Sequence, residues 1–154
     1  MNQLIVTAFE EPLEKAGFRK KSGSWYLDKV DSILVVNLQK SNYGEQFYVN
    51  LAVWLRALGS DVFPKEHKCH IRIRLASLVG EEVTKCFDAQ DSTFTDGARA
   101  RLIRSLMEEH AIPFLRDCSS IKGIRRCLKE GTLENGFVHH QVEELAGSCE
   151  DASN

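Results

Sequence analysis

The sequence lacks the long apolar run that a membrane-spanning helix needs, because no stretch approaches about 18 consecutive hydrophobic residues. Its first residues, MNQLIVTAFEEPLEKAGF, have no basic start and carry acidic residues where a signal peptide would be cleaved. The five cysteines are odd in number, scattered and without a CxxC pair, which argues against a disulfide framework. These absences predict a cytoplasmic protein with reduced thiols and no membrane partner.

The sequence also lacks a strong excess of charge of either sign. Residues 1–126 hold 19 Lys and Arg against 16 Asp and Glu, or +3, whereas residues 127–154 hold one Lys against six acids, or −5, which sums to −2. A mildly basic body with a pI near 6.2 is far from the basic footprint of a nucleic-acid-binding domain. A nucleic-acid partner is therefore not expected, although binding without chemistry stays open as a third hypothesis.

Apolar spacing divides the chain into helical and extended parts. Residues 3–16 have a helical stripe that ends at Gly17, and Pro12 is expected to bend or split this helix. The period then becomes two, which predicts strands. The strand candidates are a hairpin turning at Ser22-Gly23, then SILVVNLQK, QFYVNLAVWL and HIRIRL, with TKCFD as a short edge strand.

Helical spacing returns after residue 95. Residues 96–118 predict a helix with a bend at Pro113, and its stripe places His110 toward the sheet. A shorter helix is expected from Ser119 or Ser120 to Gly131. The fold class is α+β: a single antiparallel β-sheet of about four to six strands, with an N-terminal helix and C-terminal helices packed on one face. Residues 1–146 are expected to form one domain and residues 147–154 a polar tail.

Alternation separates the two faces of the predicted sheet. One face is almost wholly aliphatic and is expected to lie under the helices. The other face, here called the polar face, collects amides, aromatic rings, a histidine and arginines: Asn37, Gln39, Tyr48, Asn50, Trp54, His70, Arg72 and Arg74. Antiparallel sheets often have one solvated face, but asparagine is disfavoured in strands. Amides, aromatic rings and arginines are also groups that recognise partners. These eight residues are the candidate partner-binding site.

The stretch PKEHKCHIRIR places two histidines and a cysteine within four positions, which raises the possibility of a metal site. In a strand, however, Cys69 and His70 point to opposite faces, and the spacing matches no zinc pattern. Cys69 is in line with Ile71 and Ile73 and is expected to be a small buried hydrophobe. No metal, cofactor or catalytic residue is therefore assigned.

Three blocks resemble a known bacterial family: GFRKKSGSWYLDK, VVNLQKSNYGEQFYVNLAVWL and PKEHKCHIRIRL. They are similar to the signature blocks of domain of unknown function 4304, from about Leu4 to Phe114. The resemblance implies an α+β fold and a stand-alone bacterial cytoplasmic protein, and it brings no established activity. The residues after Ser119 depart from the family pattern.

Two functions are consistent with these residues. The first is a non-enzymatic protein-binding module that uses the polar face, for example an immunity protein that neutralises a bacterial toxin; this comparison is an analogy. The alternative is a hydrolase or nuclease-like enzyme that acts on a phosphate-containing substrate, with His70 as acid/base and Arg72 and Arg74 as anion clamps. The partner, the oligomeric state and the role of the acidic tail stay open.

Overall fold

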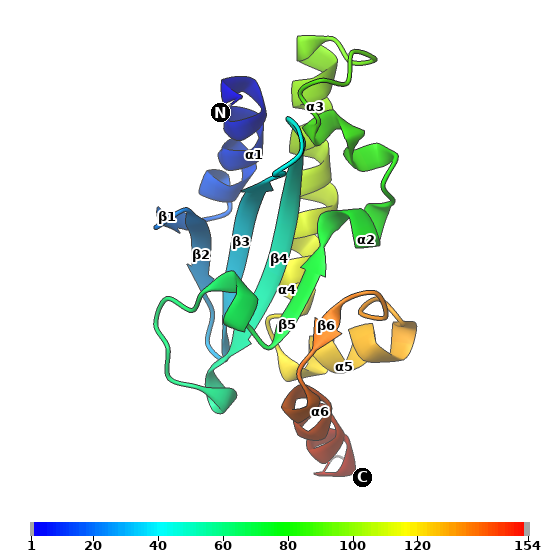
Figure 1. The fold of residues 1–154 in the computed structure, drawn as a ribbon. Coiled ribbons are helices and arrows are strands. Elements are labelled where there is room, and N and C mark those ends of the chain that lie inside the picture. The colour runs from blue at the N-terminus through cyan, green and yellow to red at the C-terminus, as the bar shows by residue number, and fades with distance from the viewer. Residues whose placement is uncertain (1, 153–154) are drawn as a thin grey trace.

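The computed structural model describes residues 2–152, and the side chains of residues 2–147. One antiparallel sheet runs through the molecule in the strand order β1-β2-β3-β4-β5-β6, so strands that follow one another in the chain are neighbours (Figure 1). This confirms the predicted single antiparallel sheet and the α+β class. The strands are β1 (Arg19–Lys21), β2 (Ser24–Asp28), β3 (Ser32–Lys40), β4 (Phe47–Leu55), β5 (Ile71–Arg74) and β6 (Phe137–Val138).

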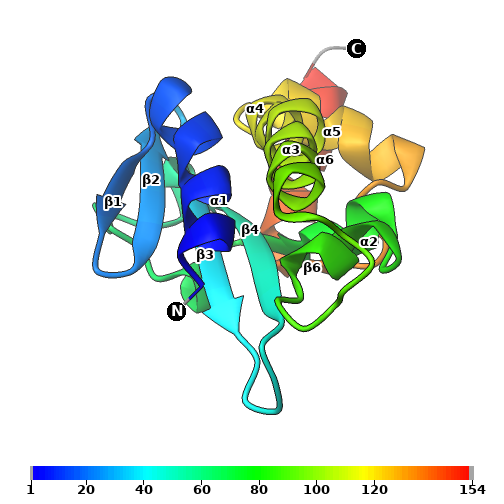
Figure 2. The ribbon, with the colours of Figure 1, turned by 90° about the horizontal axis from the view of Figure 1, so that it is seen from above.

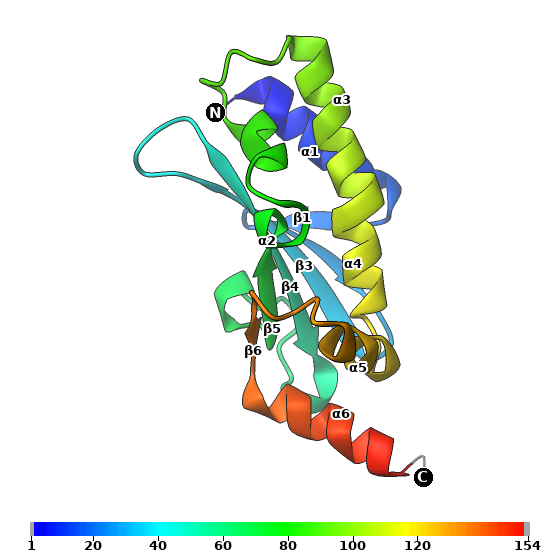
Figure 3. The same cartoon turned by 90° about the vertical axis from the view of Figure 1, so that its right-hand side faces the viewer.

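The main helices cover one face of this sheet, as Figures 2 and 3 show. They are α1 (Gln3–Lys15), α3 (Asp96–Leu106), α4 (Ile112–Asp117) and α5 (Ile121–Glu130). The short helix α2 (Leu75–Val79) follows directly on β5, and α6 (His140–Ala152) lies beyond the end of the sheet. Within the part of the chain that the structure describes, none of these helices has the length and apolar character to cross a membrane.

The aliphatic face of the sheet lies under these helices, as predicted. Leu34, Leu51 and Ile71 from the strands are fully buried in one large core. Phe9 from α1 and Ile103 from α3 belong to the same core. Burial of such side chains contributes about 1.5–3 kcal/mol each, so this layer supplies the main driving force for folding and holds the sheet rigid behind its polar face.

Helix α1 begins where Asn2 accepts a hydrogen bond from the Ile5 amide at 3.0 Å, as an N-cap does. Pro12 does not split it, contrary to one of the two expectations. Pro12 lies in the last turn of the helix, where its missing N–H removes a single hydrogen bond. The chain leaves the helix at Gly17, whose φ of 96° is the left-handed conformation that glycine adopts without strain.

Three sequence-based boundaries differ from the structure. The strand predicted over HIRIRL is shorter, because Leu75 already begins α2. The predicted edge strand TKCFD is wrong, since Val83–Phe87 form a 3-10 helix that buries Cys86 and Phe87 in the core. The short strand β6 and helix α6 were not predicted. Both gain their structure from tertiary contacts, with β6 pairing against β5.

The helix predicted over residues 96–118 is confirmed, but it contains a local irregularity. Met107–Ala111 form a π-helical turn that joins α3 to α4, directly before Ile112 and Pro113. The expectation that His110 faces the sheet is wrong, because the wider π turn shifts the stripe and leaves His110 exposed. Ser120 caps α5 and Gly131 ends it, as predicted. Helix α6 runs into the predicted polar tail of residues 147–154, of which residues 153 and 154 lie outside the described part.

Candidate functional site

The register of three central strands brings the predicted partner-binding residues to one face. Asn37 lies opposite Asn50, which in turn lies opposite Arg74, and Gln39 lies opposite Tyr48. The segment 56–70 between β4 and β5 then crosses in front of part of this face (Figure 1). It divides the polar face into two parts, which we call the covered half and the open half.

The covered half is a second, small core and not a solvated surface. Ile33, Val35, Ala52, Trp54 and Cys69 form a buried cluster, with Tyr26 packed beside it. The segment 56–70 approaches closely, since the Trp54 indole N–H donates to the Gly59 carbonyl at 3.3 Å. A Cβ on Gly59 would lie 2.3 Å from the Trp54 ring. Trp54 therefore holds this segment on the sheet and is not available as a recognition residue.

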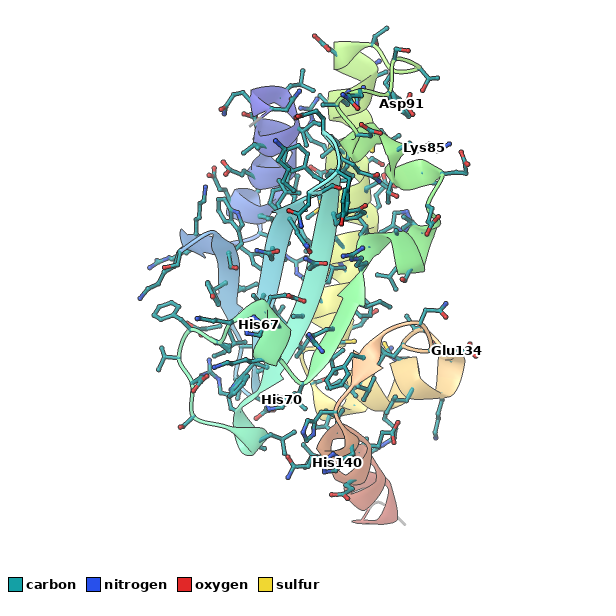
Figure 4. All side chains as sticks on the ribbon, viewed as in Figure 1. His67, His70, Lys85, Asp91, Glu134 and His140 are labelled. Carbon is teal, nitrogen blue, oxygen red and sulfur yellow. The ribbon has the colours of Figure 1, made fainter. Side chains whose placement is uncertain are left out.

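His70 also belongs to the covered half, where it has a structural role. Its ring is 7% exposed and lies 4.4 Å from the Trp54 ring, measured between centroids. The Leu55 amide donates a hydrogen bond to His70 Nδ1 at 2.9 Å, so this nitrogen is the acceptor of the ring. Burial, and secondarily the nearby His139, lowers the pKa of His70. Figure 4 shows His70 near the start of β5, with His67 on the short helix above it.

Replacement of His70 by asparagine should reduce the loss of stability in acid. The folded-state pKa of His70 lies below its unfolded value of about 6.5. Its contribution to stability is therefore complete above that value and is lost as pH falls toward the folded-state pKa. Asparagine places an acceptor near the position of Nδ1 but does not titrate. Urea unfolding at pH 7.5 and pH 5.0 should show a smaller acid-induced loss for His70→Asn than for the wild type.

His67→Asn is the matched control, because His67 is exposed on the 3-10 helix Glu66–Lys68. This control should keep the acid sensitivity of the wild type. Equal acid sensitivity of the wild type and His70→Asn would contradict the assigned role of His70.

The expectation that Cys69 lies in line with Ile71 and Ile73 is wrong. Residue 69 precedes β5, which begins only at Ile71, so strand alternation does not extend to it. Its side chain joins the covered half, where the thiol donates to the Lys65 carbonyl at 3.5 Å. Burial, followed by the charge of Glu66, raises the pKa of Cys69 to about 12. Cys69 is thus a neutral, buried thiol near pH 7. Among the described side chains, no three His, Cys, Asp or Glu residues gather as metal ligands.

The open half holds the other six predicted residues, and three of them form a network of amides. Asn50 donates through Nδ2 to Asn37 Oδ1 at 3.1 Å and to Gln39 Oε1 at 3.0 Å. Asn37 donates in turn to the Ser24 hydroxyl at 3.5 Å. Because these amides bond to one another across β2, β3 and β4, their orientation is held before any ligand arrives.

Two arginines lie over aromatic rings at the other side of the open half. The guanidinium carbon of Arg74 is 4.2 Å from the centroid of the Tyr48 ring, and that of Arg72 is 4.4 Å from the Phe137 ring. Phe137 comes from β6, so the sequence reasoning missed it. Among the described residues, neither arginine forms a salt bridge.

A groove crosses the open half at right angles to the strands. It consists of two depressions of about 570 and 360 Å³, which share Gln39, Asn50 and Glu66. The first reaches the β1–β2 hairpin at Lys21, and the second reaches β6 at Phe137. Sequence reasoning missed the walls of this groove: Lys21, Ser22, Ser24, Tyr26, Phe63, Lys65, Glu66, His67, Ser77, Asn135, Gly136 and Phe137. They come from loops and from short or peripheral elements, where no long periodic pattern marks the side that faces the sheet.

The chain has a detectable relationship to one described family of proteins. The family model with the description Domain of unknown function (DUF4304) matches residues 9–117. The matched region contains β1 to β5 and all six predicted residues of the open half, whereas Phe137 lies beyond it. No curated protein and no solved structure matches the chain.

Proposed function

The chain belongs to the DUF4304 family, and we propose that it is a non-enzymatic module that binds a protein partner in the groove of the open half. The observation that supports this function is the continuity of the groove, which reaches from the β1–β2 hairpin to β6. Five spacings between neighbouring strands amount to about 24 Å, which is the length of about seven extended residues. A groove of this length fits a segment of polypeptide.

The composition of the groove supports a protein partner. Its floor has the preoriented amides of Asn37 and Asn50, and its walls have exposed or half-buried aromatic rings such as Phe63 and Phe137. Protein interfaces are enriched in aromatic side chains and arginine. A partly buried amide network adds directional hydrogen bonds, which distinguish one partner from another. An immunity protein that binds a toxin in the bacterial cytoplasm is the form of this function that we propose.

The hydrolase alternative has less support. His70, which would be its acid/base, lies against Trp54 and lines neither depression. Its Nδ1 accepts the Leu55 amide, so the residue would have to give up a buried backbone hydrogen bond to act through that nitrogen. Arg72 and Arg74 remain able to bind an anion, but binding alone is not hydrolysis.

Substitution of Gln39 by tryptophan should block the proposed function. Gln39 is exposed and is shared by both depressions, so a large side chain there fills the centre of the groove. The purified products of neighbouring genes are the partners to test by calorimetry. We expect one of them to bind the wild type and to lose at least about thirtyfold in affinity, or about 2 kcal/mol, with Gln39→Trp.

Glu14→Trp is the control, because Glu14 is exposed on α1, in the layer behind the sheet. This variant should bind the partner as the wild type does. The proposed function is contradicted if no neighbouring gene product binds, or if a partner binds Gln39→Trp and the wild type equally well. A toxin partner should also be neutralised in cells by Glu14→Trp and not by Gln39→Trp.

A further inference from the structure

The arginines of the open half are arranged for an anionic group that none of the described side chains supplies. The guanidinium of each lies over an aromatic ring, Arg72 over Phe137 and Arg74 over Tyr48. A stacked guanidinium is held in place by cation–π attraction while its N–H bonds point outward in the plane of the group. Those N–H bonds match the two oxygens of a carboxylate.

The donors of Arg72 are incompletely used. Its Nε atom is buried and has no hydrogen-bond partner among the described residues. A buried donor without a partner is unfavourable, and this penalty is relieved when an acceptor binds beside it and the side chain adjusts. Both arginines line the depression of about 360 Å³, so an acceptor that enters this depression meets both of them.

The side chains that line the groove carry a net positive charge. Lys21 and Lys65 line the first depression, and Arg72 and Arg74 line the second, whereas Glu66 is the one acid among the lining residues. Lys21 lies over the Phe63 ring at 3.7 Å, which repeats the pairing of a cation with an aromatic ring at the opposite end. Positive charge at both ends favours a ligand that is acidic along its length.

We propose that the groove takes an acidic polypeptide segment and that Arg72 and Arg74 clamp two of its carboxylates. This inference rests on the proposed function and names the chemistry of the partner. Residues two apart on a strand are separated by about 6.6–6.8 Å. The bound segment crosses β5, so one of these arginines lies on each side of it. Neighbouring residues of an extended chain point to opposite sides, so two consecutive acidic residues match the two arginines. The acidic segment crosses the strands and binds through side chains, without adding a strand to the sheet.

A synthetic octapeptide with blocked ends and the central sequence Glu-Glu is the probe for the clamp. We expect the Nε–Hε signals of Arg72 and Arg74 to shift in NMR spectra as the peptide is added to the full chain. The same peptide with Gln-Gln in place of Glu-Glu should bind at least about tenfold more weakly. A rise in salt concentration should lower the affinity for the acidic peptide, because the charged contacts are partly exposed to solvent and salt screens them.

Variants separate the clamp from a general effect of charge. The double variant Arg72→Gln, Arg74→Gln should lose about tenfold or more in affinity for the acidic peptide. The matched control, Arg101→Gln with Arg116→Gln, removes the same charge from exposed positions on α3 and α4 and should bind normally. Arg72→Lys keeps the charge but not the planar fork, so it should recover only part of the affinity. Unfolding curves of every variant verify that it is folded.

Three results would overturn the clamp. The first is the absence of any shift at Arg72 and Arg74 with millimolar peptide, and the second is equal binding by the wild type and the double glutamine variant. Tighter binding of inorganic phosphate than of the peptide would assign the arginines to phosphate instead. If the partner from the Gln39→Trp experiment binds the double glutamine variant normally, the clamp fails while the protein-binding function stands. If Gln39→Trp does not lower the affinity for that partner, the proposed binding function itself is contradicted, whatever the result for the arginines.

Discussion

Substitution of Arg99 by methionine should lower the free energy of unfolding by about 3 kcal/mol or more. Arg99 lies in α3 and is only 5% exposed. Its Nη1 donates to the Cys86 carbonyl at 2.7 Å and to the Asp88 carbonyl at 2.6 Å, and its Nη2 donates to the Asp91 carbonyl. A single side chain therefore satisfies the backbone of the loop that connects α2 to α3.

The loss is large because methionine fills similar space but donates no hydrogen bond. The carbonyls of Cys86, Asp88 and Asp91 would lose these donors. The hydrogen bond to Cys86 is buried and the other two are partly buried, so the full cost of about 1–3 kcal/mol for an unpartnered group applies to Cys86 and a smaller cost to each of the others. Figure 4 shows Asp91 in the loop beside the first turns of α3, so that loop should become the first to open. Urea unfolding measures the loss, and hydrogen exchange at residues 86–95 should locate it.

Arg101→Met is the matched control on the same helix. Arg101 is exposed, and its replacement should change the free energy of unfolding by less than about 0.5 kcal/mol. If Arg99→Met and Arg101→Met are equally stable, Arg99 does not hold the loop in the way that its hydrogen bonds indicate.

Substitution of Gly123 by alanine should also lower stability by about 3 kcal/mol. Gly123 lies in the first turn of α5, where a Cβ would come within 1.6 Å of the Asp117 carbonyl oxygen and 2.8 Å of its carbon. Both atoms belong to the backbone, so the turn between α4 and α5 would have to open. The Gly123 amide also donates to the Ser120 hydroxyl at 3.1 Å, and this cap would be disturbed together with the turn.

Gly97→Ala in α3 is the matched control, and its effect should have the opposite sign. A Cβ at Gly97 would meet only the flexible end of Arg101, at 3.4 Å. Alanine is the better helix former, so this variant should be more stable by about 0.5 kcal/mol. Urea unfolding of both variants tests the pair. A Gly123→Ala protein as stable as the wild type would show that the α4–α5 turn relaxes without cost.

The polar face shows where strand alternation is a sound guide to the site and where it ends. Alternation placed Asn37, Asn50 and Arg74 on one face, and the antiparallel register puts these residues directly across from one another. It did not separate Trp54 and His70 from the rest, because burial of that half depends on the segment 56–70 crossing it. Ile33, Val35 and Ala52, which are apolar residues on the polar face, were the available signal for such a cover.

The walls of the groove could not be found from local pattern at all. Phe137 and Asn135 reach the site because the chain returns to the sheet after α5, where β6 pairs with β5. Phe63 and Lys65 reach it through a loop whose path is set by its contact with Trp54. Contacts between residues so far apart in sequence leave no periodic trace in either segment.

The sequence by itself determined the class of fold, the presence of a single antiparallel sheet and the composition of the polar face. Those properties follow from periods of two and 3.6 residues, which depend on near neighbours in the chain. Only the tertiary structure decided which half of that face is open, which rings lie under Arg72 and Arg74, and that His70 is committed to the Leu55 amide. The physical reason is that burial and the pairing of charged groups depend on segments distant in sequence, which meet only when the whole core has formed.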